Sequence, residues 1–265
     1  MTFFEAILLG VIQGVTEFLP VSSSGHLVIA QALMGIDLPG VLFEINVHLA
    51  TLCAVCWVYR KALLRLLGGA VRGDRSSLGY IGLLALATVP AGLVGVGLGD
   101  VLEPVFERPS IAAALLLVTG GLVWSIRVFA PRARSESPSI PKAIGVGIAQ
   151  AVAILPGISR SGSTLAVGTA LGVDATRMAE FSFLLSIPAI GGAAILQIPE
   201  MAEGGRAIGP LPLVAGFIAA AVSGVIAIRI FLAMLERKTF HRFAYYCWIV
   251  GVAYLVAAAI WPTLR

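Results

Sequence analysis

The chain has 265 residues, of which 58% are hydrophobic and only 12% are charged. Soluble domains carry roughly 25% charged residues, so this composition excludes an ordinary water-soluble protein. A formal charge of +4 would suit a nucleic-acid-binding protein. The basic residues, however, lie in short segments between apolar runs, which is how membrane topology is encoded. We therefore expect an integral membrane protein with no nucleic-acid partner.

Taken in chain order, the first segment, 3–35, is apolar but broken by Pro20 and a run of small polar residues. A similar broken segment covers 141–172. Each has the pattern of a re-entrant hairpin, whose irregular tip must be buried in protein or line a wet cavity. Six further stretches approach the roughly 20 apolar residues that a membrane span needs. They are 44–59, 78–99, 110–130, 179–198, 211–235 and 243–262.

The predicted fold class is an all-α membrane protein with six transmembrane helices and two re-entrant helical hairpins. The chain would form a single polytopic membrane domain over 1–265. The broken segments resemble each other: Gly10 and Gln13 align with Gly147 and Gln150, both at an offset of 137. This indicates a duplication with halves of about 1–135 and 136–265. Each half would cross the bilayer three times, so the second half would be inverted.

The distribution of basic residues predicts an orientation. Lysine and arginine are frequent in the predicted loops 60–77, 127–142 and 236–242, and sparse in loops 100–108 and 199–210. Basic loops stay in the cytoplasm. Both termini would therefore lie outside the cytoplasm, with the first hairpin opening outward and the second inward.

The first hairpin contains residues that carry chemistry. Gln13 and Glu17 are spaced i, i+4, which places both on one helix face. Ionisable groups inside a membrane are costly, and they mark functional sites by default. A nearby imidazole and hydroxyls offer a proton carrier and a nucleophile. These groups belong to Ser22, Ser23, Ser24 and His26.

The second hairpin adds a permanent cation. Arg160 lies between Ser159 and Ser161, with Gly157 before it and Thr164 after it. Glycine lets the backbone approach a ligand closely, and hydroxyls at a helix start favour anions. The planar guanidinium suits phosphate oxygens. If the two tips meet, they form a phosphate pocket beside a nucleophile or base.

Structural interpretations stay open for several of these residues. Glu17 would also be explained as a partner that neutralises a buried Arg160. The serines also break helices or allow close helix packing. Glu44 and His48, again at i, i+4, either support the site or pair only with each other.

The residues from Gln13 to His26 (QGVTEFLPVSSSGH) and from Pro156 to Thr164 (PGISRSGST) resemble the two signature motifs of bacterial undecaprenyl-diphosphate phosphatases, the bacitracin-resistance family. The resemblance covers the whole chain. It implies hydrolysis of undecaprenyl pyrophosphate to undecaprenyl phosphate and phosphate, which recycles the lipid carrier of peptidoglycan synthesis. It also implies a divalent cation, Mg²⁺ or Ca²⁺.

The resemblance assigns roles by position. Glu17 corresponds to the second acid of the first motif, Ser23 to its proposed nucleophile, His26 to its histidine and Arg160 to the pyrophosphate-binding arginine. Gln13 stands where many members have glutamate, so metal binding would depend mainly on Glu17, with Gln13 as a weaker ligand. The substrate-binding residues would be Gln13, Ser22, Ser24, Gly157, Ser159, Ser161 and Thr164. Whether Ser23, His26 or water attacks phosphorus stays open, and we favour Ser23 activated by His26.

The same resemblance implies a bacterial cytoplasmic (inner) membrane, an active site toward the periplasmic or outer face, and a polyprenyl pyrophosphate lipid as partner. A homodimer follows by analogy only. The main alternative is a transporter or flippase of isoprenoid phosphates, because inverted repeats with broken helices also suit alternating access. A scaffold protein would leave Glu17, His26 and Arg160 without a reason to lie in broken helices.

Overall fold

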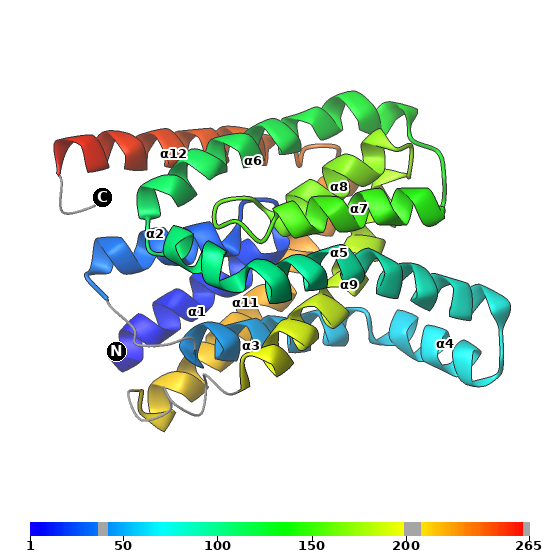
Figure 1. Cartoon of the computed structure of the whole chain (residues 1–265), viewed down its shortest axis with the longest axis horizontal. Helices are drawn as coiled ribbons and strands as arrows, with labels where there is room; N and C mark the ends of the chain where they lie inside the picture. The colour runs from blue at the N-terminus through cyan, green and yellow to red at the C-terminus, as the bar shows by residue number, and fades with distance from the viewer. Residues whose placement is uncertain (37–41, 199–207, 262–265) are drawn as a thin grey trace.

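The computed structural model describes residues 1–36, 42–198 and 208–261, which fold almost entirely into helices (Figure 1). The α-helices are α1 (Phe3–Phe18), α2 (Ser23–Met34), α3 (Leu42–Val58), α4 (Arg60–Val71), α5 (Arg75–Phe106), α6 (Pro109–Phe129), α7 (Ile140–Val152), α8 (Arg160–Ala170), α9 (Ala175–Leu196), α11 (Pro210–Glu236) and α12 (Arg242–Ile260).

Local sequence explains where several of these helices begin. Thr2 and Glu5 form a capping box, in which the Thr2 hydroxyl accepts from the Glu5 backbone N–H and the Glu5 carboxylate accepts from that of Thr2. Asp74 and Asp174 cap α5 and α9 in a simpler way, because each carboxylate accepts from two backbone N–H groups of the first turn. Such caps satisfy N–H groups that have no partner inside the helix.

The expected membrane spans are present. Five described helices are long and apolar enough to cross a bilayer on their own, and they match five of the six predicted stretches. The sixth stretch corresponds to α3, which meets the same criterion only together with α4, and these two helices are bent by 77°. The chain is therefore an all-α, multi-pass membrane protein.

Two predicted loops differ from the structure. The segment 60–77 is largely helical, because α4 occupies Arg60–Val71. Its leucines are interrupted by basic residues and glycines, so the helix is amphipathic and contains no long apolar run. Likewise, α5 continues through most of the predicted loop 100–108. The predicted loop 199–210 falls mostly outside the described residues.

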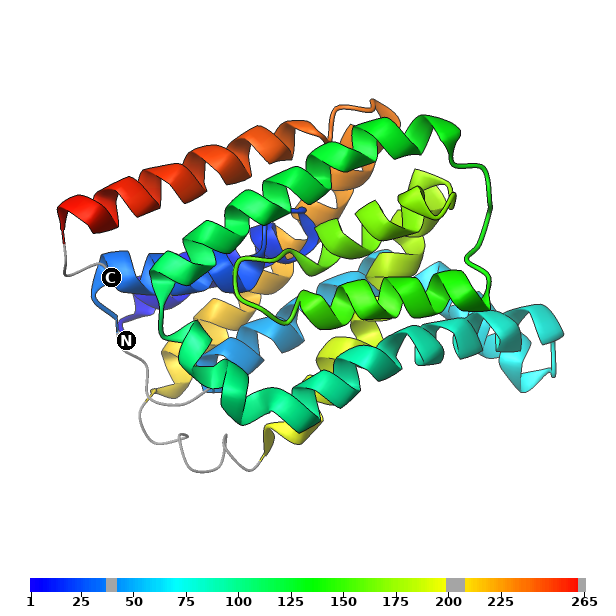
Figure 2. The same cartoon turned by 45° about the horizontal axis from the view of Figure 1, so that its top comes forward.

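Both broken segments are helical hairpins in the structure. The α1–α2 pair and the α7–α8 pair approach from opposite ends of the molecule, and their tips meet near its centre (Figures 1 and 2). The start of α1 and the end of α12 lie at one end. The helix α4 and the connection after α6, which are rich in basic residues, lie at the other. The inverted repeat relative to a bilayer stays a prediction.

Two glycines in matching positions of the hairpins allow close helix packing. A Cβ atom at Gly10 of α1 would lie 2.4 Å from the Gly216 carbonyl oxygen of α11. One at Gly147 of α7 would lie 2.7 Å from the Ala87 carbonyl oxygen of α5. Each hairpin therefore packs tightly against a long helix from the other half of the chain.

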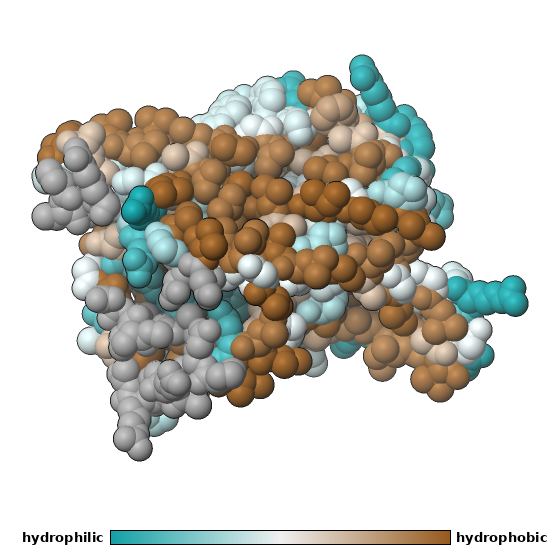
Figure 3. Space-filling model, in the orientation of Figure 1, coloured by the Kyte–Doolittle hydropathy of each residue, from teal (hydrophilic) through white to brown (hydrophobic). Residues whose placement is uncertain are grey.

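The outer surface is largely apolar. Figure 3 shows hydrophobic residues in a broad area over the middle of the molecule, with hydrophilic residues gathered toward its ends. Many large apolar side chains point outward, among them Leu93, Ile218 and Ile249. In a soluble protein such an area would be an interaction or aggregation surface, whereas here it is the surface that a multi-span protein presents to lipid.

Candidate active site

Each hairpin tip contains a serine that caps the N-terminus of the second helix. Ser22 caps α2, and its hydroxyl accepts from the Gly25 backbone N–H at 3.3 Å. Ser159 caps α8, and its hydroxyl accepts from the Gly162 backbone N–H at 3.1 Å. Ser22 has a φ of +67°, which is unusual for a residue with a side chain and costs about 1–3 kcal/mol. The surrounding contacts must hold this conformation in place.

The tips contact each other through glycine. The Gly157 backbone N–H donates to the Ser22 hydroxyl at 3.1 Å. A Cβ atom on Gly25 would lie 2.8 Å from the Cα of Gly157. Gly157 itself has a φ of +97° and borders the Ala112 carbonyl oxygen of α6. A side chain at Gly25 would push the tips apart, and one at Gly157 would collide with α6, so both glycines are needed for the hairpins to meet as closely as they do.

A cluster of polar side chains lies where the tips meet. The Arg160 Nη2 atom donates to Glu17 Oε1 at 2.7 Å. The other carboxylate oxygen, Oε2, accepts from Gln13 Nε2 at 3.0 Å and from the Ser23 hydroxyl at 2.5 Å. Gln13 and Glu17 are buried. The structure thus brings together the acid, the hydroxyl and the guanidinium that the sequence places far apart. We call Gln13, Glu17, Ser23 and Arg160 the carboxylate cluster.

His48 of α3 also faces this cluster. Its Nδ1 donates to the Glu44 carbonyl oxygen at 2.7 Å, and its Nε2 lies 3.7 Å from Glu17 Oε2. The sequence left open whether His48 pairs only with Glu44. The structure shows that its side chain reaches the site, while the Glu44 carboxylate accepts from Gln31 Nε2 at 2.8 Å.

His26 is engaged elsewhere. Its Nδ1 lies 2.7 Å from the Ser22 carbonyl oxygen, and its Nε2 lies 2.9 Å from the hydroxyl of Tyr246 on α12. Among the described residues, His26 makes no hydrogen bond to Ser23, whose hydroxyl goes to Glu17. The Ser23–His26 pair expected from the sequence is therefore not formed in this arrangement. The Ser23 hydroxyl is instead bonded to the Glu17 carboxylate of α1.

Several residues expected to bind substrate have structural partners. The Ser161 hydroxyl donates to the Leu19 carbonyl oxygen at 3.2 Å and so ties α8 to the first tip. The Thr164 hydroxyl donates to the Arg160 carbonyl oxygen at 2.8 Å and lies 2.6 Å from the Ser182 hydroxyl. With the two capping serines, these hydroxyls hold the tips in shape. Ser24, half-buried, contacts Ser22 at 3.4 Å.

The sequence did not reveal Ser182, which contacts Arg160 and Thr164, or Tyr246, which contacts His26. Tyr246 lies in an apolar span beside Tyr245, and no spacing or motif distinguishes the two tyrosines. Only the packing of α12 shows which of them reaches His26.

The donor set bears on the expected divalent cation. No group of three or more histidine, cysteine or acidic residues within the described part of the chain has metal-binding geometry. Gln13 Oε1, however, is buried beside the Glu17 carboxylate, and no described residue forms a hydrogen bond with it. Mg²⁺ commonly uses one or two protein oxygens together with substrate phosphates and water. Gln13 and Glu17 could therefore supply two ligands to a cation whose other ligands come from a pyrophosphate and water. They do not form a complete coordination shell by themselves.

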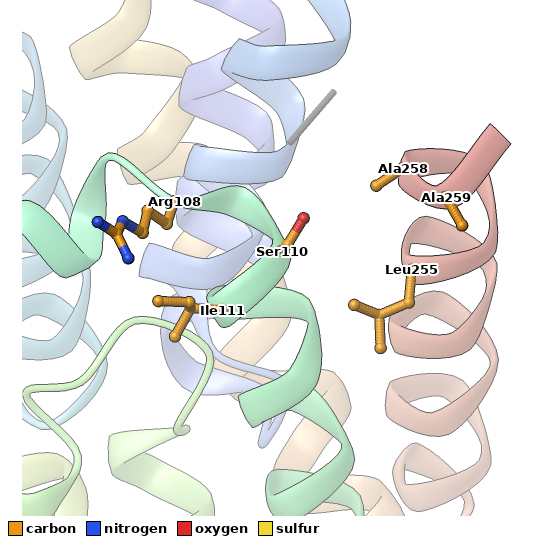
Figure 4. A pocket seen from close by; sticks show the side chains of 6 residues that line it. All are labelled: Arg108, Ser110, Ile111, Leu255, Ala258 and Ala259. Atoms are coloured by element: carbon orange, nitrogen blue, oxygen red, sulfur yellow. The ribbon is translucent and has the colours of Figure 1, made fainter. Parts of the chain in front are cut away.

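Two hollows lie on the described part of the molecule, one of them beside the first hairpin. A groove of about 340 Å³ is lined by α1, α2, His26 and Tyr246. A second, of about 540 Å³, lies between the start of α6 and the end of α12 (Figure 4). No residue of the carboxylate cluster lines the second hollow, whose lining is Arg108, Ser110, Ile111, Leu255, Ala258 and Ala259.

Together, the fold and the site define a multi-pass helical membrane protein in which a buried acid contacts a partly buried hydroxyl and guanidinium where two helical hairpins meet. The sequence profile described as "Bacitracin resistance protein BacA" matches residues 6–253. The chain belongs to this family.

Curated relatives match over nearly the whole chain. A protein of Desulfatibacillum aliphaticivorans named undecaprenyl-diphosphatase is 40% identical, over 97% of this chain and 99% of its own length. One of the same name from Carboxydothermus hydrogenoformans is 40% identical over 98% of both chains. Another from Bacteroides fragilis is 38% identical over 98% of this chain and its own full length.

Proposed function

We propose that this protein hydrolyses undecaprenyl pyrophosphate to undecaprenyl phosphate and phosphate, and so recycles the lipid carrier of peptidoglycan synthesis and contributes to bacitracin resistance. The family and the names of the relatives support this reaction. The observation that carries it is the contact of Glu17 with both Ser23 and Arg160. Phosphoryl transfer depends mainly on positioning and on neutralising charge, and these three side chains offer both.

Arg160 is the proposed phosphate ligand. A guanidinium has five N–H groups, and two of them donate in the described contacts, one to Glu17 and one to the Ser182 carbonyl oxygen. The three other N–H groups of the five are then available to donate to the oxygens of a terminal phosphate. The start of α8 adds the positive end of a helix dipole.

In the first step, the Ser23 oxygen attacks the terminal phosphorus and the bond to the bridging oxygen breaks. Undecaprenyl phosphate leaves with the electron pair, and the Ser23 proton moves to Glu17 Oε2. The hydrogen bond from Ser23 to that oxygen supports Glu17 as the base. This assignment replaces the expected activation of Ser23 by His26.

In the second step, water attacks the phosphoserine and phosphate is released. Glu17 returns its proton to the departing Ser23 oxygen. The water proton then needs another acceptor, and His26, two residues beyond the serine run on α2, supplies a basic nitrogen near the tip. The two steps together consume one water molecule and convert undecaprenyl pyrophosphate into undecaprenyl phosphate and phosphate.

Glu17 and Gln13 are the residues proposed to hold a divalent cation, through one carboxylate oxygen and the amide oxygen. When bound, such a cation would offset charge on the pyrophosphate oxygens. The protein's own contribution would be to orient these two oxygens on one face of α1.

The proposed location is the bacterial inner membrane, with both termini outside the cytoplasm and the site opening toward the outer face. The start of α1 and the end of α12 lie at the opposite end of the molecule from α4 and the connection after α6, both rich in basic residues (Figure 1), which supports this orientation under the positive-inside rule. A homodimer stays a prediction from the family likeness.

The test is phosphate release by the purified protein in detergent with undecaprenyl pyrophosphate and Mg²⁺. The wild-type protein should release phosphate, and Glu17→Gln and Ser23→Ala should release little. A carrier that only moves the lipid would bind it and release none, and this result would refute the proposed hydrolysis.

A further inference from the structure

The contacts of His26 determine which of its nitrogens is basic. Its Nδ1 lies 2.7 Å from the Ser22 carbonyl oxygen. A carbonyl oxygen only accepts hydrogen bonds, so Nδ1 carries the hydrogen. In the neutral ring Nε2 is then the nitrogen with a free lone pair, an arrangement that commonly orients functional histidines.

The hydroxyl of Tyr246 lies within hydrogen-bond distance of Nε2. The oxygen lies 2.9 Å from Nε2, and the two rings are stacked with centroids 5.5 Å apart and an interplanar angle of 8°. A tyrosine hydroxyl donates to a neutral Nε2 and accepts from a protonated one. The same hydrogen bond can therefore persist while the imidazole gains and loses a proton.

The pair borders open space. His26, Tyr246 and Thr16 are the polar residues that line the groove of about 340 Å³. The Thr16 hydroxyl donates to the Ile12 carbonyl oxygen of its own helix. The apolar walls include Val15 of α1 and Ile29 of α2. The His26 side chain is otherwise buried. The imidazole thus faces the groove and not the sealed core, with Tyr246 as its only described side-chain hydrogen-bond partner.

We infer that Tyr246 is a positioning residue for the hydrolysis, acting through His26. Its ring and hydroxyl hold the imidazole in one orientation, keep Nε2 as the basic nitrogen, and stabilise the ring in both protonation states. This inference rests on the proposed function, in which His26 accepts the water proton. It predicts that losing the hydroxyl slows turnover without weakening substrate binding.

Tyr245 provides a matched control. It is adjacent in sequence and similarly exposed, 49% against 43% for Tyr246. Its ring packs on Trp124 and Trp248, and its hydroxyl makes no hydrogen bond within the described part of the chain. Tyr245→Phe and Tyr246→Phe therefore remove the same atom from neighbouring positions on α12.

The experiment measures kcat and KM for phosphate release from undecaprenyl pyrophosphate by the purified full-length protein. Tyr246→Phe should lower kcat about tenfold, as expected for one lost hydrogen bond to a reacting group, and change KM less than about twofold. Tyr246→Leu, which also loses the stacked ring, should be slower still. Tyr245→Phe should match the wild type.

A second measurement does not depend on turnover. Nitrogen-15 spectra of histidine-labelled protein should show a shifted His26 Nε2 signal in Tyr246→Phe and an unshifted one in Tyr245→Phe. Wild-type kcat in Tyr246→Phe, or an equal loss in Tyr245→Phe, would overturn the inference while the hydrolysis stands. Wild-type protein that releases no phosphate would instead overturn the proposed function, and this inference with it.

Discussion

The Arg160 Nη2 atom lies 2.7 Å from Glu17 Oε1, although 143 residues separate the two in the chain. Glu17 stands in the last turn of α1 and Arg160 opens α8, so this one contact joins the two hairpins. Each side chain balances the charge of the other in surroundings with little water. The loss of one partner would leave the other charge buried and unpaired.

Arg160→Ala should therefore lower kcat by about 100-fold or more, because a cation that stabilises charge on the transferring phosphate is lost in a poorly solvated site. Phosphate release by purified protein measures this change. Arg127→Ala is the control, because Arg127 lies over the Trp124 ring away from the cluster. Wild-type turnover in Arg160→Ala would remove Arg160 from the mechanism.

The Glu17–Arg160 pair should also show strong coupling in stability. Removing one partner of a buried pair costs about 3–5 kcal/mol. The double variant Glu17→Gln, Arg160→Gln leaves no unpaired charge, and it should be less destabilised than the sum of the two single variants. Thermal unfolding in one detergent would show the difference, and strictly additive losses would contradict the pairing.

Neighbouring serines on α2 should differ sharply. Ser23→Ala removes the hydroxyl that donates to Glu17 and should abolish most phosphate release. Ser24→Ala removes only a 3.4 Å contact with Ser22 and should leave kcat within about threefold of the wild type, because such a contact is at the limit of a hydrogen bond. Equal losses in both variants would argue against a specific role for Ser23.

Gly157→Ala should destabilise the protein. The added Cβ would lie 2.1 Å from the Ala112 carbonyl oxygen, and the φ of +97° is unfavourable for alanine. Together these effects should cost about 2 kcal/mol or more. Gly121→Ala, on α6 with nothing within 4 Å of its added Cβ, should be neutral or slightly stabilising. Thermal unfolding and expression of monodisperse protein compare the two variants.

Gln13→Glu tests the cation site. A second carboxylate beside Glu17 should lower the Mg²⁺ concentration needed for half-maximal phosphate release, since charged ligands bind Mg²⁺ more tightly than amides. Chelation should inactivate both proteins reversibly. The control is Gln150→Glu, because Gln150 Nε2 donates to the Ala87 carbonyl oxygen instead. An unchanged Mg²⁺ requirement in Gln13→Glu would place the cation elsewhere.

Much of the fold was predictable. The six apolar stretches correspond to helices that cover nearly the same residues. The two broken segments became hairpins, because prolines, glycines and serines interrupt helices wherever they cluster. The helix α4 was missed because its apolar residues are spread over one face and not in a run.

The candidate site was only partly predictable. The types of residue followed from the sequence, which left the meeting of the two tips as a condition and did not give the pairing of the side chains. Ser23 was expected to pair with His26, yet it donates to Glu17. His26 instead pairs with Tyr246, 220 residues away, and no local pattern marks that tyrosine.

The sequence by itself determined a membrane protein of apolar helices with two polar breaks, because hydrophobicity and helix interruption depend on residues close together in the chain. Only the tertiary structure decided which nitrogen, hydroxyl and carboxylate meet. Those contacts depend on how α1, α2, α8 and α12 pack, and a turn of a few tens of degrees in any of these helices would exchange one hydrogen-bond partner for another.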